Sequence, residues 1–469
     1  MNCRKAVLET WLLVLSLSLG AAASCAQDEP QPAPDAPPKP AGYSFPGIGI
    51  GQQEGELQPD FSPLTGMQNP TVGLPELRHS YWVPGIQFTY NEFSNSGGSG
   101  WTSDNYFIGN LSLVQAWNRA LLAVNYSGGG VVSSDSQQGG GYYQQLALAQ
   151  NYQTERWLIQ FVDQYYHIPQ SAFGYGSGTN LGIPGVGGSL GNTIPGLGGN
   201  YIPNQTVYGI GPYSSNVSAL QANYALSRRG SVTVAASYGF QRFEQAGNYD
   251  SNTTVASAGY NYQLTRNDTV GLVYRFSSYQ YPGNPQAYSD NVVSIAYGRK
   301  VTGHLGLRVF VGPEITNFRI PVNGSSQRTG FSAYASMTYA FERGALTLGY
   351  LHGLTAGSGV LVGSNLDWVT ATLSHELTRQ WTGGLNFGYA HNSPVVGTAV
   401  PSNPAYGDWY VGCTAGRPIG RNFNFAVGYT ATIGTYSSVG CTGAGCNASN
   451  NYNTITINFQ WHPRPFPLP

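Results

Sequence analysis

Residues 227–240 read SRRGSVTVAASYGF, a short basic turn followed by a run in which apolar and small polar side chains alternate. Val232 and Val234 belong to one face of this run. Thr233 and Ser237 belong to the other. A period of two residues is typical of an extended strand, because successive side chains point to opposite faces of a sheet. The stretch therefore predicts a strand with one apolar face and one face of small polar groups.

The same unit recurs along the chain. Short turns, each bearing an arginine, lie at residues 117–119, 154–156, 227–230, 265–268, 299–302, 342–344, 378–380 and 417–420. The alternating stretches around them predict strands over residues 81–93, 106–117, 120–128, 142–153, 157–166, 215–226, 231–243, 253–264, 269–281, 290–299, 305–317, 331–341, 345–352, 365–377, 381–392, 406–416, 421–435 and 452–461. Strand, tight turn, strand and long loop, repeated, is typical of outer-membrane β-barrels.

Alternation of this kind also occurs in soluble β-sandwiches, whose core face is apolar. The predicted strands are about ten residues or longer, against the usual five or six of soluble sheets. Charged residues make up only 9% of the chain, and aromatic residues make up 13% and gather near strand ends, as in interfacial girdles. We therefore expect an all-β fold, a transmembrane antiparallel β-barrel of about eighteen strands (16–18), with short periplasmic turns and long outer loops.

The first residues resemble an export signal. Arg4 and Lys5 precede an apolar run over residues 11–19, and small residues follow it. That run is too short to span a membrane comfortably. Residues 1–26 are therefore expected to be a cleaved signal peptide.

Three further segments follow the signal. Residues 27–78 are rich in proline, which favours extended conformations and cannot build a core. We interpret them as a periplasmic segment that tethers, with a plug as the less favoured alternative. Residues 79–461 form the predicted barrel, and residues 462–469 are a proline-rich C-terminal tail.

In this architecture residues 81–461 resemble general and sugar-selective porins. The last predicted strand ends INFQW at residues 457–461 and resembles the C-terminal signal that the assembly machinery reads, although eight residues follow the aromatic. The resemblance implies that the third outer loop, residues 167–214, folds inward as a constriction; a surface loop is the alternative. Candidates for stacking on sugar rings in this loop are Tyr175, Tyr201, Tyr208 and Tyr213.

The face opposite the apolar one is expected to line a pore, and it carries mainly Ser, Thr, Asn, Gln, Gly and Ala. Its charged members are Arg275, Arg308 and Glu314. Arg308 and Glu314 share a face six residues apart, roughly 20 Å along a strand, so they are not a contact pair. Either they produce a weak field across the pore, or pore water solvates each separately.

The histidines do not predict catalysis. His352, His375 and His391 fall in the apolar sets, with no Asp or Ser at a suggestive spacing, and His375 lacks the second His of a zinc motif. We expect no enzyme activity, cofactor or metal. The net charge of -1 gives no reason to expect nucleic acid.

The cysteines outside the signal region are few. Cys441 and Cys446 lie in a glycine-rich loop, and their spacing suits a small disulfide in an oxidising compartment. Cys413 is expected to face lipid as a small apolar residue.

One strand conflicts with this scheme. The apolar set Trp157, Ile159 and Phe161 continues into Asp163, which places a carboxylate in lipid if the register holds. Charge at that depth costs a few kcal/mol. Either a β-bulge shifts the register above Phe161, or a subunit interface, as in a homotrimer, shelters the carboxylate.

The sequence thus predicts an outer-membrane channel for passive diffusion of small neutral or weakly charged hydrophilic solutes, sugars among them. Its expected partners are outer-membrane lipid and lipopolysaccharide, the assembly machinery, the solutes, and two further copies in a homotrimer. The alternative is a structural or adhesive barrel that acts through its surface loops.

Overall fold

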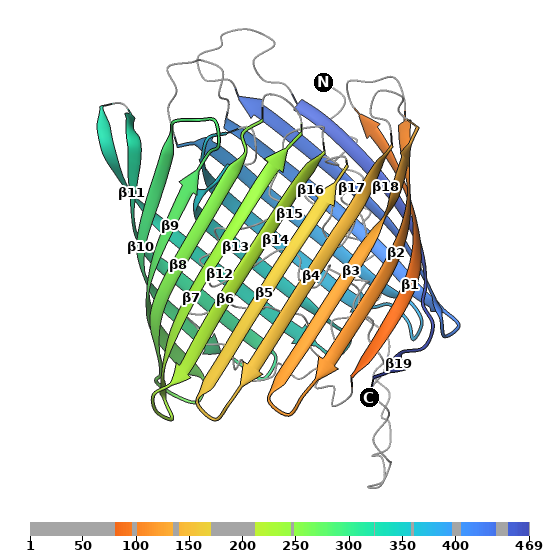
Figure 1. Ribbon diagram of the computed structural model, residues 1–469, viewed down its shortest axis with the longest axis horizontal. Helices are drawn as coiled ribbons and strands as arrows, with labels where there is room; N and C mark the ends of the chain where they lie inside the picture. The colour runs from red at the N-terminus through yellow and green to blue at the C-terminus, as the bar shows by residue number, and fades with distance from the viewer. Residues whose placement is uncertain are drawn as a thin grey trace, which may run out of the picture. The chain divides into compact units, whose positions relative to one another are not determined.

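The computed structural model describes residues 80–95, 101–134, 140–169, 212–244, 248–322, 324–357, 361–395, 405–437 and 449–468 (Figure 1). The strands are β1 (Tyr81–Asn95), β2 (Trp101–Ala116), β3 (Ala120–Ser133), β4 (Gly141–Gln153), β5 (Trp157–Ile168), β6 (Tyr213–Ala225), β7 (Gly230–Phe243), β8 (Ser251–Gln263), β9 (Asp268–Gln280), β10 (Ala287–Lys300), β11 (Leu305–Val322), β12 (Ser325–Phe341), β13 (Gly344–Thr355), β14 (Ser364–Glu376), β15 (Thr382–Pro394), β16 (Ala405–Ile419), β17 (Phe423–Ser437), β18 (Ser449–Trp461) and β19 (Phe466–Pro467). In these ranges, no helix is long and apolar enough to cross a membrane.

The first eighteen strands form a closed antiparallel barrel. Each strand pairs with the next, and β1 pairs with β18 from Ile86 opposite Trp461 to Asn95 opposite Tyr452. Closure satisfies the backbone of both end strands, which a sheet in hydrocarbon requires. Each predicted strand coincides with an observed one, so the expected fold class is confirmed with eighteen strands. Figure 1 shows the strands tilted, with short turns at one end.

Hydroxyl side chains shape several of the short turns. Five turns begin with Ser or Thr, and the hydroxyl accepts a hydrogen bond from the backbone N–H three residues later. The five acceptors are Thr154, Ser227, Thr265, Thr302 and Thr378. This local bond offers the backbone a turn in place of a continued ladder, so the sequence itself ends each strand there.

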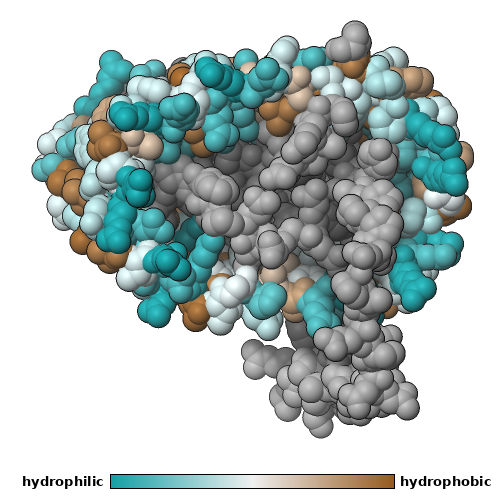
Figure 2. All heavy atoms as spheres, turned by 90° about the horizontal axis from the view of Figure 1, so that it is seen from below, coloured by the Kyte–Doolittle hydropathy of each residue, from teal (hydrophilic) through white to brown (hydrophobic). Residues whose placement is uncertain are grey.

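The two faces of the sheet differ in chemistry. On β1, Ile86 is 63% exposed, whereas Gln87 is 1% and Thr89 is 0% exposed. On β10, Ile295 is 66% exposed and Ser294 is 6% exposed. Alternation therefore directs apolar side chains outward and polar side chains to the enclosed side, as in a barrel surrounded by lipid. Seen from the end with the short turns, hydrophilic residues are spread around the rim (Figure 2).

The C-terminal tail extends the closing seam. Phe466 and Pro467 form β19, which pairs antiparallel with Trp82 and Tyr81 beyond the last β1–β18 pair. The rings of Trp82 and Phe466 stack with centroids 4.9 Å apart. The backbone N–H of Leu468 donates to the carbonyl of Ser80 at 2.9 Å. The expected separate tail is thus partly a strand of the sheet.

Asp163 lies on the outward face with its carboxylate hydrogen-bonded. The register of β5 is continuous with both β4 and β6, so a β-bulge above Phe161 is ruled out. Asp163 Oδ1 instead accepts from Ser218 Oγ at 2.5 Å and from Asn216 Nδ2 at 3.2 Å. Two donors on the neighbouring strand therefore offset part of the cost of a carboxylate on this face.

Candidate functional site

A charged group lies on the inner wall formed by β9, β10 and β11. Arg275 pairs with Val292, and Val292 pairs with Glu314, so these positions form one row across three strands. Arg275 and Glu314 are each 5% exposed and face the enclosed side. The structure thus brings together two of the three charged residues expected to line the pore.

The third, Arg308, lies on the same face of β11 as Glu314, six residues closer to the short turns. It pairs with Gly298 on β10 and Ser336 on β12. Arg308 therefore belongs to a lower level of the wall than Glu314.

Asp290 completes the charged group and was missed by sequence reasoning. Its Oδ2 lies 3.4 Å from Arg275 Nη2, and its side chain is 0% exposed. Asp290 lies on the same face of β10 as Val292, Ser294 and Ala296. Because Val292 and Ala296 are apolar, the sequence pattern did not show that this face points inward, although the polar Ser294 lies on it. A buried carboxylate needs such a partner, because an unpaired buried charge is costly.

The outer end of β13 lies against this wall inside the barrel. Three tyrosine hydroxyls from β9, β10 and the connection between them donate to successive carbonyls at the end of β13 and just after it. The pairs are Tyr279 to Leu354 (3.1 Å), Tyr288 to Thr355 (2.8 Å) and Tyr281 to Ala356 (2.7 Å). Three strands, β10 to β12, separate β9 from β13 in the sheet, so the chain crosses the enclosed space to make these bonds. We call Tyr279, Tyr281 and Tyr288 the tyrosine clasp.

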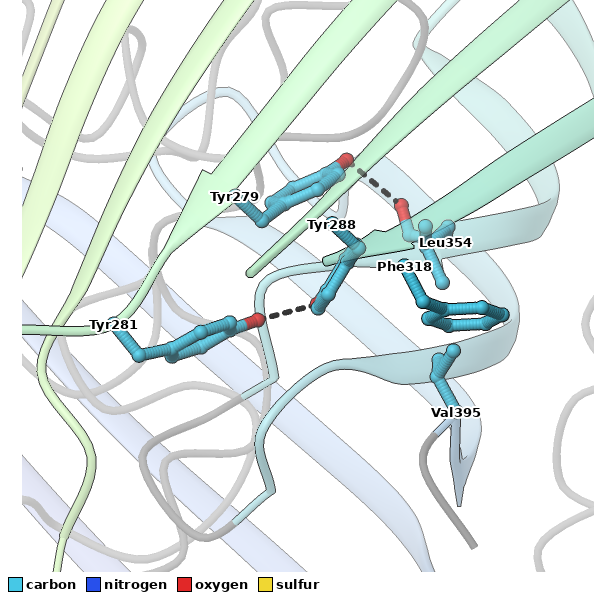
Figure 3. Close-up of a cluster of buried hydrophobic side chains, with 6 residues drawn as sticks. All are labelled: Tyr279, Tyr281, Tyr288, Phe318, Leu354 and Val395. Atoms are coloured by element: carbon cyan, nitrogen blue, oxygen red, sulfur yellow. Dashed lines mark hydrogen bonds between the residues drawn. The ribbon is translucent and has the colours of Figure 1, made fainter. Parts of the chain in front are cut away.

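Packing reinforces the tyrosine clasp (Figure 3). Its rings form a buried cluster with Phe318, Leu354 and Val395. Tyr281 lies beyond the end of β9, and burial raises the pKa of its phenol well above the usual value, so this hydroxyl stays protonated. Its hydroxyl oxygen also lies beside that of Tyr288, so the two hydroxyls share their two protons between each other and the carbonyls of Thr355 and Ala356.

Two further contacts fix the β13–β14 connection. The backbone N–H of Leu354 hydrogen-bonds to the carboxylate of Glu314, which ties the connection to the charged group. Gly363 adopts a φ of +78°, and a Cβ there would lie 2.1 Å from the Tyr288 hydroxyl. A larger residue would therefore both strain the backbone and displace the clasp.

Amides and hydroxyls cover another part of the inner wall. A chain of side-chain hydrogen bonds crosses β18, β1, β2 and β3. Its links are Asn458 to Thr89 (2.7 Å), Gln87 to Thr89 (3.1 Å), Asn110 to Gln87 (3.3 Å) and Ser127 to Asn110 (2.7 Å). The wall on this side is uncharged and rich in groups that both donate and accept.

The loop tyrosines are only partly described. Tyr175, Tyr201 and Tyr208 lie outside the described residues, as does most of the expected constriction loop. Tyr213 is the first residue of β6 rather than a loop residue; it is 3% exposed and its ring stacks on Phe243 with centroids 5.8 Å apart. Residues 354, 356 and 362, at the end of β13 and in the described parts of the β13–β14 connection, instead pack against the buried cluster inside the barrel, which the sequence did not indicate.

Of the three cysteines outside the signal region, the structure describes one. Cys441 and Cys446 lie outside the described residues, so their expected disulfide stays a prediction. Cys413 is exposed on the outward face of β16 with a free thiol, as expected.

His352 has the acidic partner that sequence spacing did not reveal. It pairs with Asp367 across β13 and β14, and its Nδ1 lies 2.7 Å from Asp367 Oδ1. The ring of Phe331 stacks on His352 at 4.3 Å. All three lie on the outward face, so this pair does not belong to the inner wall. Within the described ranges no group of three or more His, Cys, Asp or Glu side chains could hold a metal ion.

No family model matches the chain, and no curated protein matches it. The chain is similar to the solved structure of Pseudomonas aeruginosa OpdQ, with 10% identity and a TM-score of 0.42 over 83% of this chain and 100% of that one. It is also similar to the outer membrane protein OpdK from Pseudomonas aeruginosa (8% identity, TM-score 0.42, 82% and 100% covered). A third similar structure is Acinetobacter baumannii OccAB4 (8% identity, TM-score 0.43, 83% and 99% covered).

Proposed function

We propose that this protein is an outer-membrane channel through which small hydrophilic solutes, neutral or weakly charged, diffuse passively. The observation that carries the proposal is a closed barrel of eighteen strands with an apolar outward face and a polar enclosed face. Barrels of about sixteen to eighteen strands enclose an aqueous lumen. A structural role alone would not require so polar an inner wall.

The proposed channel function also implies where in the cell the protein lies and how it is oriented. The expected signal peptide, residues 1–26, directs export, and the short turns face the periplasm. The outward apolar side chains contact outer-membrane lipid, and the rim above them contacts lipopolysaccharide. Insertion depends on the assembly machinery, which reads the last strand of the barrel.

The inner wall supports selection by size and polarity. The β13–β14 connection, held by the tyrosine clasp, occupies part of the enclosed cross-section beside the charged group Arg275, Asp290 and Glu314. The amide and hydroxyl chain on β18 to β3 offers hydrogen bonds that replace part of the hydration of a hydroxylated solute. Sugars are one class of uncharged solute that fits this wall.

Purified protein in a planar bilayer tests the channel. We expect stepwise conductance, and we expect vesicles loaded with the protein to swell in solutions of small neutral sugars but not of large polysaccharides. Protein unfolded by boiling in SDS serves as the control. A correctly folded barrel that leaves the membrane sealed would reject the channel and favour the structural or adhesive alternative.

A further inference from the structure

Asp408 lies on the inner face of β16, away from the charged group already described. The exposed Trp409 and Val411 alternate with it and point outward. Asp408 pairs with Ala390 on β15 and with Gly434 on β17, and neither neighbour carries a polar side chain. The nearest cross-strand positions therefore supply no donor and no positive charge.

One oxygen of the Asp408 carboxylate is buried without a hydrogen-bond partner in the part of the chain that the structure describes. Asp408 is only 3% exposed, and the oxygen in question is Oδ2. Asp290, by contrast, has Arg275 beside it. Because an unpaired buried charge is costly, a cation beside this carboxylate would stabilise its ionised form, and the side chains directly opposite, Ala390 and Gly434, supply none.

Two aromatic residues lie near Asp408 on the same face of the sheet. Trp368, Ala390 and Asp408 form one row across β14, β15 and β16, and the alanine between the other two is buried. Tyr410 follows Asp408 on the inner face, and its ring covers Gly388, where a Cβ would lie 2.0 Å from a ring carbon. Trp368 and Tyr410 both pack against the buried cluster of Leu351, Leu366 and Ala390.

A carboxylate beside aromatic faces is the chemistry that recognises organic cations. The anion attracts the positive charge, and the ring faces attract the methyl or methylene groups next to the nitrogen through cation–π interaction. An inorganic cation would gain little from the rings because it keeps its hydration shell. We propose that Asp408, Trp368 and Tyr410 form a subsite that binds ammonium-bearing organic solutes at the outer end of the barrel.

This inference rests on the proposed channel and names a solute class for it. Asp408 lies three residues from the start of β16, at the end of the barrel where the long connections lie. A cationic solute entering from that end meets the subsite before it reaches Arg275 and Arg308. The channel should therefore favour solutes with an ammonium group over neutral solutes of the same shape.

The test compares choline with 3,3-dimethyl-1-butanol, its neutral isostere, as blockers of single-channel current. We expect choline to interrupt the current at concentrations about tenfold lower than the isostere. Asp408→Asn should raise the choline concentration for half block by about tenfold, and Tyr410→Leu should raise it several-fold. Asp163→Asn removes the same charge from the outward face and should leave choline block unchanged.

Three results would overturn the subsite: equal block by choline and its isostere, unchanged choline block in Asp408→Asn, or equal weakening in Asp163→Asn. Calorimetric titration of choline into the folded barrel in detergent micelles provides a measurement that needs no current. A barrel that binds choline through Asp408 but does not conduct would reject the channel and keep the site. A conducting barrel that binds choline and its isostere equally would do the reverse.

Discussion

The hydroxyl of Tyr279 on β9 donates a hydrogen bond to the carbonyl of Leu354 on β13 at 3.1 Å, across 75 residues of sequence and three intervening strands. Neighbouring strands of a barrel lie about 4.8 Å apart, so this bond cannot follow the wall. It joins two parts of the wall through the enclosed space. The end of β13 is thereby held against β9.

Loosening that bond should change conduction more than stability. Tyr279→Phe removes one hydroxyl and keeps the ring, so the loss is about 1 kcal/mol of local restraint on the β13–β14 connection. We expect larger current fluctuations and a higher mean conductance in single-channel recordings. The control is Tyr274→Phe on the outward face of the same strand, which loses a bond to Asn291 (2.7 Å). Identical recordings from both variants would show that the connection does not limit the current.

The Arg275–Asp290 pair should behave as a buried ion pair. Arg275→Met leaves the carboxylate of Asp290, which is 0% exposed, without its cation. We expect the free energy of unfolding to fall by about 3–5 kcal/mol, measured by urea titration in lipid vesicles. The double variant Arg275→Met/Asp290→Leu should recover most of that loss, because it removes both charges. A double variant as unstable as the single one would contradict this account.

Strand positions could be predicted from the sequence because they depend on local chemistry. Alternation over Ser231–Phe240 reports which face meets lipid, and hydroxyl residues such as Thr265 and Ser227 begin the turns. Parity along a strand also indicated that Arg275 and Glu314 face the enclosed side. These signals need only a residue and its neighbours in the chain.

Contacts across the barrel could not be predicted in this way. Strand register decides which residue of β14 lies opposite His352, and spacing along the chain does not give that register. Asp367 was therefore missed as the partner of His352. The tyrosine clasp was missed for a related reason. Tyrosine is common throughout the chain, with 33 copies, and nothing local marks Tyr279 or Tyr288 as bonded to β13.

Asp163 offers a test of what surrounds the barrel. If lipid meets this face, Asp163→Leu should stabilise the barrel by about 1–2 kcal/mol in vesicles, because a carboxylate at that depth is unfavourable even with Ser218 and Asn216 bound to it. Unfolding by urea measures the change, and light scattering in detergent measures the mass. A fall in mass from trimer to monomer would instead assign Asp163 to a subunit contact, the arrangement that the sequence left open.

The seam between β1 and the C-terminal tail should raise the temperature at which the barrel opens. Phe466→Ala removes the ring that stacks on Trp82 at 4.9 Å, a contact worth about 0.5–1.5 kcal/mol. Deleting residues 462–469 also removes β19 and the bond from Leu468 to Ser80. We expect both variants to convert to the unfolded form at lower temperature in a heat-modifiability gel, the deletion more than the substitution. Arg464→Ala changes an exposed residue of the same tail and should convert like the wild type; an equal shift in all three would mean that the tail does not act through the seam.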